Sequence, residues 1–582
     1  EGEYNLSEPV YTPTGQVIRR YMSGGLGLNN LIIHNNPVDS KVGLYTTPEE
    51  NIVSSAIESK GKVLLSNDKL VIQKPTIEAP IELTTLKTAA SAMKEGEKPN
   101  LTAPSLNFSD LKSLEASLKG IVEEVSLGVV YAGTFKVINE SALRSELIDK
   151  LVYDATFNPN KDIVNEARRL IKGIAVSLGA RPDSTYDLYL EKAKDQRHYT
   201  IPAINIRGMA YNSARAVFES AVKNKVEDPF ILEIARSEIG YTAQRPAEYT
   251  TSVLSAAIKE GYKLPVYLQG DHFQITAKEH KENLPAAMEK VQKLIREAIE
   301  AGFYQIDLDT STLVDWSKPT AGEQQELNYK MAAKLTAYVR QLERDLGLDK
   351  QGIVVNLGGE IGEIGMGLEK GKERNSSVED LRAFMNGYNA ELERLSKESG
   401  FKLNPITKVA VQSGTKHGGV RDSQGKVIKA KVGFNTLAEL GKVAREEFGL
   451  AGVVQHGAST LPEDYFTVFA GNKMPTGLTI DESLLNQEGQ TTLDRHPVAE
   501  VHLATAYQDT VLDHPEFPAD LRDEIFKRIL EWNPPKEGQD PNKVFVDNRK
   551  NAWGEFKLQT WNMPSDIQTA MRNSLRAQFD TV

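Results

Sequence analysis

Four of the nine histidines directly follow short apolar runs that are typical of buried parallel strands. They are His272, His417, His456 and His502, in the strings VYLQGDHF, VAVQSGTKHGG, GVVQHGAS and AEVHLAT. The carboxyl ends of parallel strands meet at one rim of a barrel, so we expect these imidazoles to converge there. A divalent metal acting as a Lewis acid binds neutral imidazoles and keeps one coordination position open. His272, His417 and His456 each lie beside Gly or Asp and are our candidate ligands.

Further polar residues are expected at the same rim. On or after the first, third, fourth and fifth strand candidates stand Asn205, Asp271, Asp307, Asp309 and Glu360. Side chains alternate along a strand, so Asp271 and His272 cannot face the same side of a regular one. At the frayed end of the strand, Asp271 is either a general acid or base beside the metal or a residue that orients a ligand.

The elements that position these residues form a regular series. From His198 onward, apolar runs alternate with amphipathic helical stretches about eight times. The strand candidates are YTIPAINI, FILEIA, PVYLQGD, YQIDLD, IVVNLGGE, KVAVQSG, AGVVQHG and AEVHLA. Parallel strands covered by helices close, in sets of eight, into a barrel. The sequence therefore predicts an α/β protein with a (β/α)₈ TIM barrel and C-terminal tail over residues 198–582.

An N-terminal extension is expected before the barrel. Residues 1–138 carry Gly, Asn, Pro and Thr between short apolar stretches, which indicates β or irregular structure of unclear fold. Residues 139–197 hold three helical patterns, each with an Asn or Asp near its start that can cap it. This second segment is predicted to be a helical lead-in to the barrel.

The composition of the chain excludes several classes of function. The net charge is −11 and the basic residues are scattered, which argues against a nucleic-acid partner. There is no cysteine, so any metal must be bound by His and carboxylates. No apolar run approaches the roughly 20 residues that cross a bilayer, and no signal-peptide pattern opens the chain. We expect a soluble, cytoplasmic protein with small-molecule chemistry and no membrane partner.

Two Gly-rich turns suggest an anionic substrate. In GTKHGGVR, the backbone near Gly418 and the guanidinium of Arg421 can bind a phosphate, and in QHGAST the turn from Gly457 to Ser459 can do the same. Together with Thr505 after the eighth strand, they resemble the usual phosphate site of barrel enzymes.

The motifs together resemble the class II, metal-dependent fructose-bisphosphate aldolase family. YTIPAINI is similar to its first strand and PVYLQGDHF to its Asp-His strand. YQIDLDTS, GGEIG, SGTKHGGV, VVQHGAS and DPNKVFVDNR resemble further segments of the family, in the same order. The resemblance covers about His198 to the C-terminus and leaves an additional region before it.

This resemblance implies roles for individual residues. It makes His272, His417 and His456 the ligands of a catalytic zinc, and Glu360 a ligand of a second or mobile cation. It makes Asp271 the proton-transferring group at the C4 hydroxyl of the substrate. The proton-abstracting carboxylate of the family lies on a loop after the fifth strand, where Glu369 aligns best and Glu363 is the rival.

The same resemblance implies a sugar phosphate as substrate. Around the phosphate of dihydroxyacetone phosphate it places Gly418, Arg421, Gly457, Ser459 and Thr505. Arg549 would bind a second phosphate, and Asn205 and His502 would contact the substrate. The expected activity is the reversible cleavage of fructose 1,6-bisphosphate into dihydroxyacetone phosphate and glyceraldehyde 3-phosphate, as in glycolysis, by a homo-oligomer (a dimer or higher).

Departures from the family pattern keep alternatives open. In HLATA, His502 replaces a substrate-contacting Asn, and Ala504 and Ala506 replace two aspartates. Ala235 stands where the family has a Ser. An aldolase for another ketose phosphate, such as tagatose bisphosphate, is therefore the alternative, followed by a non-catalytic barrel subunit. A metal-dependent hydrolase is disfavoured because its typical His-x-His pair is absent from IPAINI.

Overall fold

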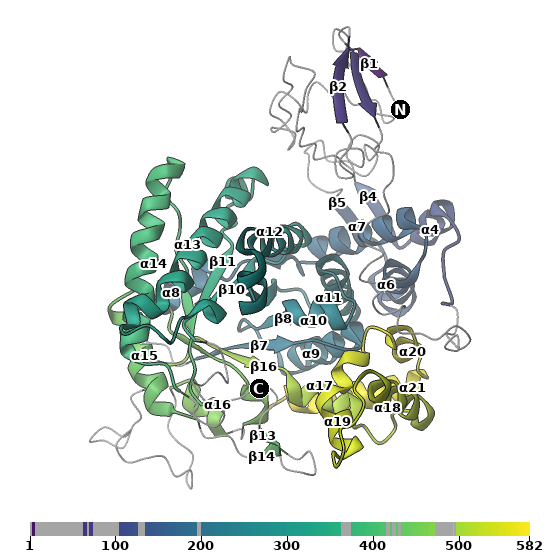
Figure 1. The fold of residues 1–582 in the computed structure, drawn as a ribbon. Helices are drawn as coiled ribbons and strands as arrows, with labels where there is room; N and C mark the ends of the chain where they lie inside the picture. Colours follow the sequence, from purple (N-terminus) through teal and green to yellow (C-terminus); the bar gives the residue numbers. More distant parts are fainter. Residues whose placement is uncertain are drawn as a thin grey trace. The chain divides into compact units, whose positions relative to one another are not determined.

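The structure is a computed structural model. It describes residues 3–5, 62–66, 69–73, 104–125, 134–194, 199–362, 374–414, 420–421, 427–428, 432–461, 464–471, 493 and 496–581. The chain divides into two compact units, residues 1–100 with 344–351 and residues 101–343 with 352–582. In the first, β1 (Glu3–Asn5), β2 (Lys62–Ser66) and β3 (Lys69–Gln73) pair antiparallel in the order β1-β3-β2 (Figure 1). The boundaries at residues 138 and 197 stay predictions.

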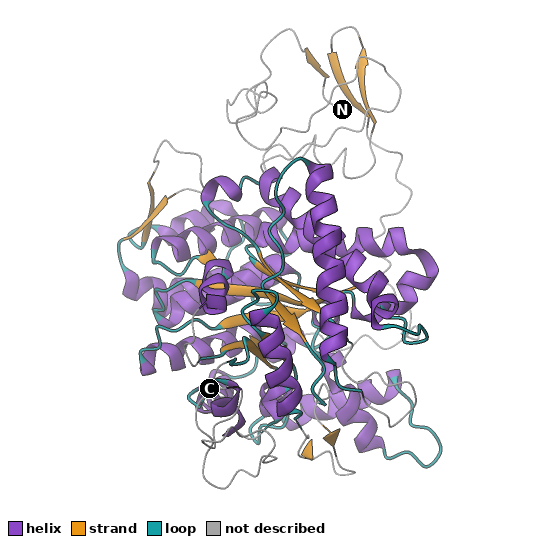
Figure 2. Ribbon diagram, turned by 90° about the vertical axis from the view of Figure 1, so that its left-hand side faces the viewer, coloured by secondary structure: helices purple, strands orange, loops and turns teal. Residues whose placement is uncertain are grey.

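The second unit contains a closed parallel barrel. Its strands are β7 (Ile201–Asn205), β8 (Ile231–Ala235), β9 (Val266–Gln274), β10 (Gln305–Asp309), β11 (Asn356–Glu360), β12 (Lys408–Ala410), β15 (Val453–Gln455) and β16 (Glu500–Leu503). They pair in this order around the ring; β16 pairs with β7, and a β9–β10 pairing completes it. Figure 2 shows the strands gathered at the centre of the helices. The predicted (β/α)₈ fold is confirmed. Each strand candidate contains one of these strands except PVYLQGD, because β9 continues three residues beyond it.

Helices cover the outside of the barrel. They are α9 (Ala210–Asn224), α10 (Arg236–Tyr241), α11 (Pro246–Glu260), α12 (Ala277–Ala301), α13 (Ala321–Asp345), α14 (Val378–Ser399), α15 (Phe434–Glu446), α16 (Asp464–Phe469) and α17 (Thr505–Leu512). Side-chain caps define several starts; for example, Ser377 accepts a hydrogen bond from the Asp380 amide. Within α12, Asn283 leaves the helical conformation two residues before Pro285, which the ring of Pro explains. None of the described helices is long and apolar enough to span a bilayer.

Helices also precede the barrel in the sequence. α4 (Leu111–Leu118) lies in the segment expected to be β or irregular. The lead-in region contains α5 (Glu140–Ala142), η2 (Leu143–Leu147), α6 (Ile148–Phe157), α7 (Lys161–Ser177) and α8 (Tyr186–Lys194). The predicted caps Asn139 and Asn160 accept hydrogen bonds from backbone amides of α5 and α7. Tyr189 of α8 is buried among residues at or just before the first residues of β7, β8, β15 and β16. This helix therefore closes the end of the barrel opposite the rim.

Short strands and turns complete the unit. They are the hairpin β4 (Val122–Val125) with β5 (Thr134–Val137), the hairpin β13 (Val420–Arg421) with β14 (Val427–Ile428), β6 (Pro182–Asp183) on β9, and the 3₁₀ turns η3 (Ser311–Leu313) and η5 (Ala458–Thr460). The 3₁₀ turn η4 (Asp349–Gln351) belongs to the first compact unit.

The C-terminal tail is helical and packs against the rim beside β7 and β8. Its elements are α18 (Ala519–Trp532), α19 (Pro541–Asn548), η8 (Arg549–Ala552), α20 (Lys557–Trp561) and α21 (Ser565–Phe579). The indole of Trp553 lies directly over Gly208, which follows β7, and the Gly554 amide donates to the Tyr241 carbonyl at 2.9 Å. A Cβ atom on Gly208 would lie 2.4 Å from Trp553 Cδ2. This contact therefore requires glycine.

A Gly208→Ala substitution is expected to destabilise the protein by about 1–3 kcal/mol, the usual cost of overpacking a well-packed contact. The loss of stability is measured as a shift in the urea midpoint of unfolding, followed by tryptophan fluorescence. Gly240→Ala is the matched control, because a Cβ at Gly240 meets no atom within 4 Å. Equal midpoints for the two variants would show that the indole moves aside without cost.

Candidate active site

A β-bulge brings Asp271 and His272 to the same side of β9. In the pairing of β9 with β10, Ile306 faces Gly270 and Leu308 faces Phe273, so one residue on β10 opposes two on β9. His272 takes the left-handed conformation, with φ 45°. The alternation expected of a regular strand does not apply here, because the extra residue interrupts it.

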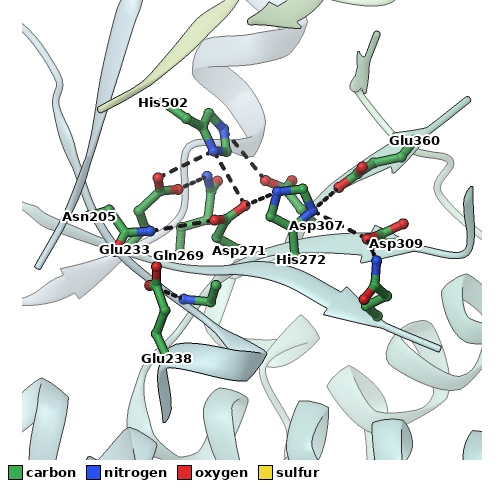
Figure 3. Close-up of polar contacts among 12 residues, drawn as sticks. Asn205, Glu233, Glu238, Gln269, Asp271, His272, Asp307, Asp309, Glu360 and His502 are labelled. Carbon is green, nitrogen blue, oxygen red and sulfur yellow. Dashed lines mark hydrogen bonds and ion pairs between the residues drawn. The ribbon is translucent and has the colours of Figure 1, made fainter. Parts of the chain in front are cut away.

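His272 connects the third, fourth and fifth strands (Figure 3). Its Nδ1 lies 2.8 Å from Glu360 Oε1 and 3.2 Å from Asp309 Oδ2, and its Nε2 lies 3.6 Å from Asp271 Oδ1. The centroid of its ring is 4.5 Å from that of His456, which follows β15. All three carboxylates are buried. Strand ends far apart in the sequence thus meet at one point of the rim.

His502 lies on the other side of His456. Its ring centroid is 4.3 Å from that of His456. Its Nδ1 is 3.2 Å from Glu233 Oε1 and 3.3 Å from Asp271 Oδ1, and its Nε2 is 2.7 Å from Glu500 Oε1. The three imidazoles therefore form a row across the rim, with Asp271 between the outer two.

The residues at the first end of this row fit a divalent metal. Ligand atoms of His272, Glu360 and His456 lie within 4.8 Å of one another. Glu360 is buried, and its Oε1 faces the imidazole of His272 at 2.8 Å. Imidazole and carboxylate are the donors that zinc and its neighbours in the first transition row bind. Two of the four metal ligands implied by the sequence, His272 and His456, are thus brought together with a third, Glu360.

Without a cation, the carboxylates and imidazoles share protons unequally. Burial opposes charge on Asp271, but His272 and His502 outweigh it and hold the pKa of Asp271 well below its usual range. Burial opposes charge on His272 too, yet Asp271 and Glu360 raise its pKa well above the ordinary value. Burial raises the pKa of Glu360 to about 8. Asp271 is therefore ionised in this cluster, and its carboxylate is available to accept a proton.

A charged network lies beneath the rim, inside the barrel. Lys408 Nζ, at the start of β12, lies 2.6 Å from Glu500 Oε1, 3.0 Å from Asp307 Oδ1 and 2.8 Å from Gln269 Oε1. Gln269 also donates to Glu233 Oε2 at 2.8 Å, and the Tyr189 hydroxyl donates to Glu500. Through these contacts, His502 and Glu233 at the rim are connected to Tyr189 at the closed end of the barrel.

The structure places the remaining predicted residues as follows. His417, Gly418, Glu363 and Glu369 lie outside the described residues, and of Arg421 and Thr505 only the backbone is described, in β13 and at the start of α17. Asn205 Nδ2 lies 3.5 Å from Asp271 Oδ2. Gly457 has φ 68° and precedes η5, and Ser459 Oγ accepts from the Ala506 amide at 3.3 Å. This contact joins the turns after the seventh and eighth strands.

Arg549 is buried away from any contact with the row of imidazoles. Its guanidinium pairs with Asp509, at 2.6 Å, and with Asp513. These two carboxylates of the α17 segment neutralise its charge. Its proposed contact with a second phosphate stays a prediction.

The sequence analysis missed Glu233, Gln269, Lys408 and Glu500. Each is a polar residue within an apolar strand run, and Gln269 and Glu500 stand two residues before Asp271 and His502. Residues two apart face the same side of a strand, so this spacing was the available signal.

Barrel enzymes of this fold place their chemistry at the rim where these residues meet. A family model described as "Fructose-bisphosphate aldolase class-II" matches residues 184–550. The chain therefore belongs to the class II fructose-bisphosphate aldolase family, as its motifs predicted.

Individual relatives match this chain over a short stretch or at low sequence identity. The D-tagatose-1,6-bisphosphate aldolase subunit GatZ of Escherichia coli K12 is 36% identical over 101 residues, which cover 17% of this chain and 22% of that protein. A crystal structure of fructose-bisphosphate aldolase from Campylobacter jejuni is similar with TM-score 0.33 at 16% identity, covering 72% of this chain and 92% of that one. A probable tagatose 6 phosphate kinase from Sinorhizobium meliloti reaches TM-score 0.40 at 16% identity, covering 65% and 87%. The chain thus spans about a fifth of the curated relative, and the two structural likenesses carry no argument about function.

Proposed function

We propose that this protein is a metal-dependent aldolase that cleaves fructose 1,6-bisphosphate reversibly into dihydroxyacetone phosphate and glyceraldehyde 3-phosphate. The observation that carries the proposal is the bulge in β9, which sets an ionised carboxylate, Asp271, beside the metal-binding group of His272, Glu360 and His456. A general base next to a Lewis acid is the pair that retro-aldol chemistry needs.

In this mechanism, His272 and His456 hold the metal, with His417 as the third imidazole. When bound, the metal polarises the substrate carbonyl and stabilises negative charge as it develops there. Asp271 accepts the proton of the C4 hydroxyl while the C3–C4 bond breaks and the aldehyde leaves. A carboxylate of the loop after β11, Glu369 or its rival Glu363, then returns a proton to C3 of the remaining three-carbon fragment.

Substrate binding is proposed for the groups around this centre. Gly418, Arg421, Gly457, Ser459 and Thr505 bind the phosphate of dihydroxyacetone phosphate, Arg549 the second phosphate, and Asn205 and His502 the sugar hydroxyls. Zinc is the proposed metal, because imidazoles dominate the ligand set. The proposal includes a cytoplasmic homo-oligomer that serves glycolysis.

Tagatose 1,6-bisphosphate is the second candidate substrate. It differs from the fructose compound in the configuration at C4, the carbon whose hydroxyl meets Asp271. His502, which lies 3.3 Å from Asp271 Oδ1, replaces the family's Asn at this point, and Ala504 and Ala506 replace its aspartates. The relatives matched over 101 residues are subunits of a tagatose-bisphosphate aldolase, which also keeps a non-catalytic barrel subunit in consideration.

A cleavage assay with both bisphosphates tests the proposal. Protein treated with EDTA is expected to lose turnover, and Zn²⁺ is expected to restore it, with fructose 1,6-bisphosphate cleaved faster. Faster cleavage of tagatose 1,6-bisphosphate would make it the preferred substrate in place of fructose 1,6-bisphosphate. No cleavage of either by protein that holds stoichiometric zinc would contradict an aldolase and favour the non-catalytic subunit.

A further inference from the structure

Three buried polar atoms beside the end of β7 have no hydrogen-bond partner among the described residues. They are Asn205 Oδ1, Gln508 Oε1 of α17 and Trp553 Nε1 just after η8. Asn205 and Trp553 are each only 4% exposed. Leaving buried polar atoms unpaired is costly, so a small group that pairs with all three stabilises the fold.

These three residues line one small cavity between the end of β7, α17 and the C-terminal tail. The cavity offers about 10 Å³ to the centre of a water molecule, which is close to the room that a single water needs. Apolar side chains, among them Ile206, Val511 and Leu575, form other parts of its wall. The cavity is therefore the size of one water and too small for a sugar phosphate.

The three unpaired atoms have the hydrogen-bonding character that one water requires. An indole N–H is only a donor, and an amide oxygen is only an acceptor. Asn205 Nδ2 faces Asp271 Oδ2 at 3.5 Å, so the oxygen of the same amide is turned away from that carboxylate (Figure 3). One water that accepts from Trp553 and donates to Gln508 and Asn205 pairs all three atoms.

We propose that a buried water at this position joins Trp553 of the C-terminal tail to Asn205 and thereby holds the Asn205 amide against Asp271. Trp553 is then a positioning residue, because it acts on the reaction only through the water and Asn205. A hydrogen bond accepted by the amide oxygen also strengthens the one that the amide nitrogen donates. The effect on catalysis rests on the proposed aldolase function, whereas the water bridge does not.

A high-resolution crystal structure of the full chain tests the water bridge without substrate. We expect one ordered water within about 2.7–3.2 Å of Trp553 Nε1, Gln508 Oε1 and Asn205 Oδ1. Density that shows no water at this point would overturn the proposal. A direct hydrogen bond between any two of the three atoms would overturn it as well.

Cleavage kinetics test the positioning role. Trp553→Phe keeps an aromatic ring beside Gly208 but has no N–H, and its kcat for fructose 1,6-bisphosphate is expected to fall about 10-fold, the lower end of the effects of residues that orient groups at metal centres. KM is expected to stay within about twofold, because the indole does not touch the substrate. Exchange of a carbon-bound proton of dihydroxyacetone phosphate with D₂O, which needs no group at C4, is expected to be unchanged. Equal losses in cleavage and exchange would overturn the role, since general damage to the fold lowers both.

A second variant removes the same water from its other side. Gln508→Leu is expected to lower kcat as much as Trp553→Phe, and the double variant is expected to lose no more than either single one, because residues that share one hydrogen-bonded network are not additive. Losses that multiply would contradict a shared water. Trp532→Phe is the matched control, because this indole of the same tail lies beside the Arg528 guanidinium, and it is expected to change no rate. If the unmodified protein cleaves neither bisphosphate, the proposed function fails, and the crystal structure still decides whether the water bridge exists.

Discussion

The Asp271→Asn variant is expected to cleave fructose 1,6-bisphosphate about 10³-fold more slowly than the unmodified protein, within the 10²–10⁴-fold range of general acid–base catalysis. Asp271 is held ionised by His272 and His502, so at neutral pH it can accept the proton of the C4 hydroxyl. An amide of the same size cannot. The coupled cleavage assay with saturating Zn²⁺ measures the effect on kcat.

A partial reaction separates proton transfer from structural damage. Exchange of a carbon-bound proton of dihydroxyacetone phosphate with D₂O needs the metal and the loop carboxylate but no acid or base at C4. We therefore expect Asp271→Asn to retain this exchange within about tenfold while it loses cleavage. Asp315→Asn, at an exposed turn after η3, is the control and is expected to change neither rate. Equal losses in exchange and cleavage would contradict the assigned role of Asp271.

Lys408→Met is expected to lower the stability of the barrel by about 3–5 kcal/mol, the usual effect of removing one partner of a buried ion pair. The side chain of Lys408 is 1% exposed and its ammonium group pairs with Asp307 and Glu500. Methionine has a similar length but removes the positive charge that both carboxylates face. The urea midpoint of unfolding, followed by far-UV circular dichroism, measures the loss.

Two further variants separate charge from packing. Lys293→Met, at a side chain that is 77% exposed on α12, makes the same chemical change and is expected to alter stability by less than about 0.5 kcal/mol. Adding Glu500→Gln to Lys408→Met removes one of the uncompensated charges, so the double variant is expected to be more stable than Lys408→Met. A double variant that is less stable would attribute the loss to packing around Lys408.

The barrel was predictable because its buried strands are continuous apolar runs, and many of the helices between them repeat apolar residues with the helical period of about 3.6. α11 is the longest of the barrel helices that no pattern marked. Nearly all its residues from Pro246 to Ile258 are buried, because it packs against α6, α7, α9 and α12, so it lacks the polar face that reveals a surface helix. The C-terminal helices were missed as elements because only a short motif near Arg549 had been read there.

The candidate active site was predictable in part. His272, His456, Asp271 and Glu360 were identified from their positions after strands, and the structure brings them together. The contact between Asp271 and His272 could not be derived from spacing, because a bulge is a property of the pairing between two strands and not of one strand alone. The interior network around Lys408 was also missed, since a lysine at the start of a strand has the same local sequence whether it faces solvent or the barrel axis.

The left-handed backbone of His272 limits how this position can be altered. His, Asn and Asp tolerate this conformation better than most residues with a side chain, and β-branched residues tolerate it poorly. An alanine variant would therefore combine loss of a ligand with backbone strain, whereas asparagine removes the imidazole and keeps the fold of the strand. A transfer of this centre to another barrel would need the two-against-one register of β9 and β10 as well as the side chains.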